Sequence, residues 1–172
     1  MAKIDPQTAK EISDKAYTLA YEYEQKYGCC PQCVLAAIKD VLGVGDDATF
    51  KASHCLAGGG GLSTKGTCGA LAGGMLALSS KYGRDRENFA KGRFLKSHQL
   101  GKQLYDKFVA EFGDPVCGEV QRKVLGRPFN MWDPKDYKAF EEAGGHKDKC
   151  PHVAGMVARW TAELLIESEK EA

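Results

Sequence analysis

Seven cysteines are the residues of this 172-residue chain best suited to chemistry. Proline is favoured at the first position of a helix, and Asp and Thr are favoured caps before it. Four cysteines stand beside such residues: Cys33 in Cys30-Pro31-Gln32-Cys33, Cys68 after Thr67, Cys117 after Asp114-Pro115-Val116, and Cys150 before Pro151. The sequence therefore predicts each of these four thiols in the first turn of a different helix.

This placement has a consequence for the thiols. The start of a helix carries free N–H groups and the positive end of the helix dipole, and both stabilise an anion. A cysteine there is expected to lose its proton more easily, and the thiolate is the form that binds metal. The four cysteines lie far apart in the sequence and lack the paired C-x-x-C ligands of zinc ribbons and ferredoxins. Only the fold could bring them together.

The elements that must position these four cysteines are predicted to be helices throughout the chain. Apolar residues recur every three to four positions, and no segment alternates as a strand does. We expect an all-α, single-domain bundle of about seven or eight helices over residues 1–172, with a glycine-rich loop before a central helix. The expected helices span 6–27, 31–42, 48–56, 68–82, 87–112 and 116–125, with a short one from 134 and a last one that Cys150 caps and that carries Val153 to Leu164.

The glycine-rich loop, Gly58 to Thr67, has neither the Walker A order nor the strand that precedes a dinucleotide fingerprint. It could be a flexible turn. Alternatively, its backbone N–H groups could approach the sulfides of a cluster. On that second interpretation the cofactor-binding residues are Gly59, Gly60, Gly61 and Gly69.

Composition limits the partners. The formal net charge is +1, so a nucleic-acid partner is not expected. No apolar run is long enough to span a bilayer, and the first residues lack a signal-peptide pattern. We expect a cytoplasmic protein, where structural disulfides are rare, and the long first helix would suit a homodimer.

The residues Cys68-Gly69-Ala70-Leu71-Ala72-Gly73 fit a C-G-A-x-x-G motif. With the glycine run before it and single cysteines at 33, 117 and 150, residues 28–166 resemble the C_GCAxxG_C_C family of redox-active proteins. A similar domain occurs in split-Soret cytochromes, where four cysteines hold an iron–sulfur centre. The resemblance implies Cys33, Cys68, Cys117 and Cys150 as metal ligands. The chain has no C-x-x-C-H, so no c-type haem is expected.

Three functions remain open from the sequence. The first is an electron-transfer protein with a [2Fe–2S] or [4Fe–4S] cluster and an unknown redox partner. The second is a metal-free thiol–disulfide enzyme that uses Cys33 or Cys68 with a resolving cysteine. The third is a structural zinc adaptor. Cys29 and Cys55 are expected to be thiols without a role, and Cys30 to be a resolving thiol or a spare ligand.

Overall fold

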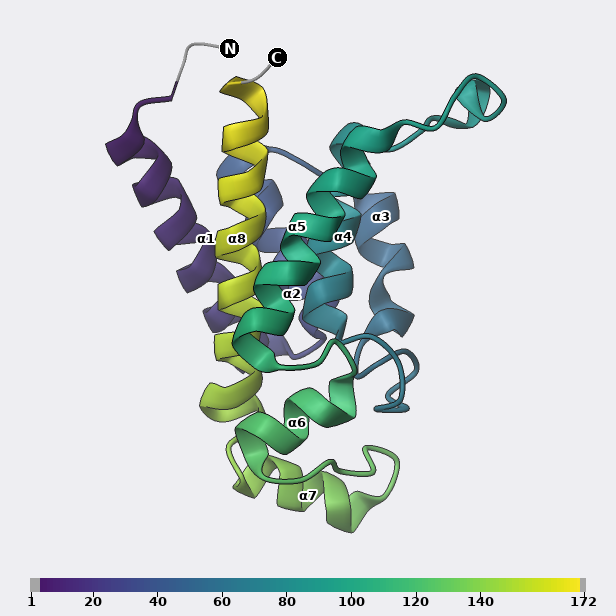
Figure 1. The fold of residues 1–172 in the computed structure, drawn as a ribbon. Helices are drawn as coiled ribbons and strands as arrows, with labels where there is room; N and C mark the ends of the chain where they lie inside the picture. Colours follow the sequence, from purple (N-terminus) through teal and green to yellow (C-terminus); the bar gives the residue numbers. More distant parts are fainter. Residues whose placement is uncertain (1–3, 171–172) are drawn as a thin grey trace.

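The computed structural model describes residues 4–170 as a bundle of eight α-helices (Figure 1). Within that range, the extended backbone pairing is an isolated antiparallel bridge between Thr67 and Val116. The predicted all-α class is confirmed. The helices are α1 (Pro6–Tyr27), α2 (Cys30–Leu42), α3 (Asp47–Ala52), α4 (Gly69–Tyr82), α5 (Leu95–Phe112), α6 (Cys117–Leu125), α7 (Pro134–Glu142) and α8 (Cys150–Lys170). Short 3-10 turns, η1 (His54–Leu56) and η2 (Arg86–Asn88), and a π-helical turn, η3 (Gly145–Lys149), complete them.

Several helix ends follow the local signals in the sequence. The Asp5 carboxylate accepts hydrogen bonds from the backbone N–H groups of Gln7 and Thr8 at the start of α1. Asp133 caps α7 in the same way. A side-chain acceptor at this position satisfies N–H groups that have no partner within the helix. The predicted starts of α1 and α7 are therefore confirmed.

Three expected elements differ from those in the structure. The helix expected over 48–56 ends at Ala52, and the chain continues through Ser53 into the 3-10 turn η1. The helix expected from 87 begins only at Leu95, after Phe94 in a left-handed conformation. The π-helical turn η3, which the sequence did not predict, leads directly into α8.

The core lies around α8, which packs against α1, α2, α4 and α5. Its centre is built of fully buried aliphatic and aromatic side chains, among them Ile38, Leu71, Leu104, Phe108, Val157 and Leu165. The apolar positions Ala16 and Ala20 of α1 are buried in this core. No helix within residues 4–170 has the length and apolarity needed to cross a membrane. The homodimer and the cytoplasmic location stay predictions.

One end of the bundle gathers several helix starts. The first residues of α2, α4 and α8 lie at the end where α6 and α7 pack, in the lower half of Figure 1. The loop between α4 and α5 projects from the opposite end. Segments that are far apart in the sequence therefore meet at the lower end, where the cysteines are found.

Candidate functional site

Six cysteines line one cavity of about 440 Å³, and four of them come from four different helix starts. These four are Cys30 at the start of α2, Cys68 just before α4, Cys117 at the start of α6 and Cys150 at the start of α8. Cys68 and Cys117 are buried, and Cys30 and Cys150 are partly exposed. A negative charge on Cys68 or Cys117 would raise the pKa of Cys30 and of Cys150, which reflects their proximity. We call these four the thiol quartet.

The quartet contains Cys30 and not Cys33, which the sequence reasoning had chosen. Cys33 is buried one helical turn further along α2, and its thiol donates to the Gly28 carbonyl at 2.9 Å. The Glu24 carboxyl lies near it and helps to raise its pKa. Because the hydrogen bond to Gly28 holds the Cys33 thiol beside α1, it does not line the cavity. Whether any of these cysteines binds metal stays a prediction.

Cys68 and Cys117 are held side by side by backbone hydrogen bonds. The Cys68 N–H donates to the Pro115 carbonyl at 2.7 Å, and the Cys117 N–H donates to the Gly66 carbonyl at 2.9 Å. These bonds flank the Thr67–Val116 bridge. The bridge ties the end of the glycine-rich loop to the segment before α6, so both cysteines reach the cavity from adjacent backbone.

Cys30 approaches Cys68 because α2 and α4 are in close contact there. A Cβ on Gly69 would lie 2.6 Å from Cys30 Sγ, and a Cβ on Gly73 would lie 2.6 Å from the Pro31 carbonyl oxygen. Both distances are too short for real atoms, so only glycine fits at these positions. Gly69, expected to face a cofactor, thus makes room for the Cys30 thiol.

The other glycines chosen from the sequence are used mainly within their own loop. The N–H groups of Gly60 and Gly61 donate to carbonyls of the preceding turn, including Cys55. The Gly59 carbonyl accepts from the Gly66 N–H, and a Cβ on Gly59 would lie 3.0 Å from the Cys117 Cβ. The N–H of Gly58 lies near the Cys30 sulfur and opposes the rise that burial causes in that thiol's pKa. A cofactor contact of Gly59, Gly60 or Gly61 stays a prediction, but the N–H groups of the last two are already engaged.

The helix starts do not make these thiols acidic in the metal-free protein. Burial raises the pKa of Cys68 to about 11, although hydrogen bonds from the N–H groups of Ala70 and Leu71 oppose the rise. Burial also raises the pKa of Cys30, Cys117 and Cys150. For Cys150 the nearby Glu24 carboxyl adds to the rise. The expected loss of protons is therefore wrong for the metal-free state, because desolvation outweighs the helix dipole.

A carboxyl group that sequence reasoning missed also lines the cavity. Glu24 of α1 is only 2% exposed, and its Oε2 has no hydrogen-bond partner. Its Oε1 lies 3.8 Å from His146 Nε2, and His146 Nδ1 lies 2.5 Å from Glu141 Oε1. Burial raises the pKa of Glu24. The position gave no sequence signal, because one Glu on an amphipathic helix resembles any solvated charge.

The thiol quartet does not form a site for a single metal ion in this structure. Within residues 4–170, no three His, Cys, Asp or Glu side chains are close enough to hold a single metal ion. In a [4Fe–4S] cluster each of four thiolates binds its own iron, and in a [2Fe–2S] cluster two thiolates bind each iron. Sulfide ions bridge the irons in both. Four separated thiols around a cavity are compatible with that arrangement.

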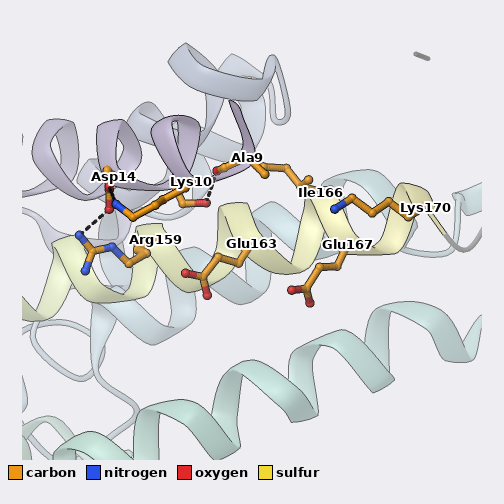
Figure 2. Close-up of a pocket in the computed structure, with 9 residues that line it drawn as sticks. Ala9, Lys10, Asp14, Arg159, Glu163, Ile166, Glu167 and Lys170 are labelled. Atoms are coloured by element: carbon orange, nitrogen blue, oxygen red, sulfur yellow. Dashed lines mark hydrogen bonds and ion pairs between the residues drawn. The ribbon is translucent and has the colours of Figure 1, made fainter. Parts of the chain in front are cut away.

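A second cavity lies elsewhere and contains no thiol. It measures about 740 Å³ and lies between α1 and α8, near Lys10 and Lys170 (Figure 2). Asp14 in this cavity pairs with Arg159 at 3.0 Å and with Lys10, and none of the residues that line the cavity is a cysteine or a histidine. We therefore place the candidate site at the thiol cavity.

Fold and cavity together define an all-helical protein in which buried thiols converge at one end of the bundle. The family model described as "Putative redox-active protein (C_GCAxxG_C_C)" matches residues 28–164. The chain belongs to this family, as its C-G-A-x-x-G motif predicted. No curated protein and no solved structure matches it significantly.

Proposed function

We propose that this protein binds an iron–sulfur cluster through Cys30, Cys68, Cys117 and Cys150. The observation that supports it is the convergence of these four thiols, one from each of four helix starts, on a single cavity. Cysteine thiolates are the usual ligands of [2Fe–2S] and [4Fe–4S] clusters. A bound cluster would supply one-electron transfer.

The protein groups around the cavity would tune such a cluster. N–H groups of Gly58, Ala70 and Leu71 point at the Cys30 and Cys68 sulfurs. Hydrogen bonds to sulfur and exclusion of water both shift a cluster's potential. The exposed rings of Tyr27 and Trp132 at the cavity mouth would meet an electron-transfer partner. The partner's identity is open.

Raised thiol pKa values favour this function over the metal-free thiol enzyme. A neutral thiol is a weak nucleophile, whereas a metal deprotonates the thiol that it binds. Burial raises the pKa of both Cys33 and Cys68, the pair considered for that enzyme. Cys33 also lies outside the cavity lining. A structural zinc ion would need the thiols to move closer together than they are.

Anaerobic purification and reconstitution test the proposal. The expected result is a coloured protein with bound iron, acid-labile sulfide and visible charge-transfer absorption that changes on reduction. The matched control changes Cys29, Cys33 and Cys55 to Ser and leaves the quartet intact, so it should retain the colour. Colourless, iron-free wild-type protein after anaerobic reconstitution would overturn the proposal.

A further inference from the structure

Two cysteines outside the quartet, Cys29 and Cys55, line the mouth of the same cavity. Cys55 is exposed, in the three-residue turn η1, and Cys29 is partly exposed, just before α2. The Cys29 thiol contacts the His54 carbonyl, with 3.8 Å between Sγ and O. That carbonyl belongs to the peptide group that joins His54 to Cys55.

Covalent geometry limits how far apart the two cysteines are. A carbonyl oxygen lies roughly 2.8 Å from the Cα of the following residue across a trans peptide. The Cys29 sulfur therefore lies within about 7 Å of the Cys55 Cα. This bound joins a sulfur to a Cα atom, whereas a disulfide requires the two Cα atoms to lie about 4.4–6.8 Å apart. Rotation of the exposed Cys55 side chain together with a movement of η1 would bring the two sulfurs together.

The other thiols are held away from this pair. Cys33 donates to the Gly28 carbonyl, and Cys30 is packed against Gly69. Cys68 and Cys117 are buried deeper in the cavity wall. Among the cysteines at this end of the molecule, Cys55 is the one whose residue is exposed, and Cys29 contacts the peptide beside it.

We propose that Cys29 and Cys55 form a reversible disulfide at the cavity mouth, with a low-molecular-weight disulfide as the oxidant. Cys55 attacks the oxidant, its S–S bond breaks, and the first small thiol leaves with a proton. Cys29 then attacks the mixed disulfide at Cys55, forms the Cys29–Cys55 bond and releases the second small thiol with the other proton. The electron pair passes to the oxidant, so two protein thiols are exchanged for two small thiols.

The pair would link two walls of the cavity. Cys29 precedes the helix that carries Cys30, and Cys55 precedes the glycine-rich loop. A covalent bond between them would restrain the segment whose Gly58 N–H reaches the Cys30 sulfur. The inference does not depend on a bound cluster, since neither cysteine belongs to the quartet.

Mass spectrometry tests the pair directly. The anaerobically purified chain is equilibrated with mixtures of reduced and oxidised glutathione, quenched in acid, blocked with N-ethylmaleimide and digested with trypsin. Titratable thiols should fall from seven to five, and peptides 27–39 and 52–65 should become linked, with Cys29 as the linked residue in fragment spectra. A thiol count that remains seven, or a link through Cys30 or Cys33, would overturn the proposal.

Serine variants sharpen the result. Cys29→Ser should retain a glutathione adduct on Cys55 and form no linked peptide, whereas Cys55→Ser should form neither. Cys33→Ser is the matched control in the same tryptic peptide. It should form the Cys29–Cys55 link with the same midpoint in the glutathione titration as the wild type. Loss of the link in Cys33→Ser, or its persistence in Cys29→Ser, would contradict the assignment. These outcomes are independent of iron content, so they are separable from failure of the proposed function.

Discussion

The Cys30 thiol occupies the space that a side chain on Gly69 would need, since a Cβ there would lie 2.6 Å from Cys30 Sγ. Gly73, four residues further along α4, makes the equivalent room for Pro31. Residues four apart share one face of a helix. The C-G-A-x-x-G motif is therefore a side-chain-free face on which the start of α2 packs, and this contact brings Cys30 beside Cys68.

Gly69→Ala should disturb both the packing and the site. The added methyl group must displace the Cys30 sulfur, Pro31 or the Leu56 carbonyl. Overpacking of this kind costs about 1–3 kcal/mol. We expect the free energy of unfolding to fall by about that amount in urea titrations, and the iron retained after reconstitution to fall with it.

Gly101→Ala is the matched control for this change. Gly101 lies in the middle of α5, and a Cβ there would meet nothing within 4 Å. Alanine in a helix interior is favoured over glycine by about 1 kcal/mol. This variant should be as stable as the wild type or more stable, with normal iron content. Equal losses in both variants would mean that the Gly69 contact has no special role.

The cap residues and the cysteine ligand set differ in how far sequence could predict them. Asp5 and Asp133 were found because a cap acts on the N–H groups two or three residues away. Cys30 and Cys33 both belong to Cys-Pro-Gln-Cys, and nothing in that segment distinguishes them. The distinction comes from α4, whose Gly69 lies more than thirty residues further along the chain.

Cys30→Ser and Cys33→Ser separate the two candidates for the α2 ligand. If the quartet holds a cluster, Cys30→Ser should lose most of its iron and visible absorption because one thiolate ligand is missing. Cys33→Ser should keep both, since that thiol faces the Gly28 carbonyl. Iron and sulfide analysis on protein reconstituted in parallel decides between them. The reverse pattern would restore Cys33 as the ligand predicted from the sequence.

The backbone at Cys29 is strained, and its substitution tests that strain. Cys29 has φ 66°, a left-handed conformation that glycine adopts freely and other residues adopt at a cost of about 1–2 kcal/mol. Cys29→Gly should therefore be more stable than Cys29→Ala by about 1 kcal/mol. Both variants lack the thiol, so their difference in urea midpoint reports the backbone alone. Equal midpoints would show that the turn relaxes.

Glu24→Gln should change how stability depends on acidity. Burial raises the pKa of Glu24 in the folded state above its unfolded value of roughly 4.3. The neutral carboxyl contributes its stability below that pH, and the contribution is lost as the pH rises through the folded pKa. Glutamine stays neutral, so the free energy of unfolding of the variant should rise relative to that of the wild type between pH 4 and pH 7. Glu22→Gln, at an exposed position of α1, is the control, and its stability should depend on pH as that of the wild type does.

The metal-free, reduced protein should lose stability in alkali. Burial raises the pKa of Cys68 to about 11, above the unfolded value of roughly 8.5. Between these values the unfolded chain binds fewer protons than the folded one, so stability falls as the pH rises, by up to about 1.4 kcal/mol per pH unit for this thiol. Urea titrations with chelator and reductant at pH 7, 8.5 and 10 measure the slope. Cys68→Ser should reduce the slope without abolishing it, because burial raises the pKa of Cys30, Cys33, Cys117 and Cys150 as well. Cys55→Ser, at the exposed position, should leave the slope unchanged. An identical slope in all three proteins would show that the buried Cys68 thiol titrates as it does in water.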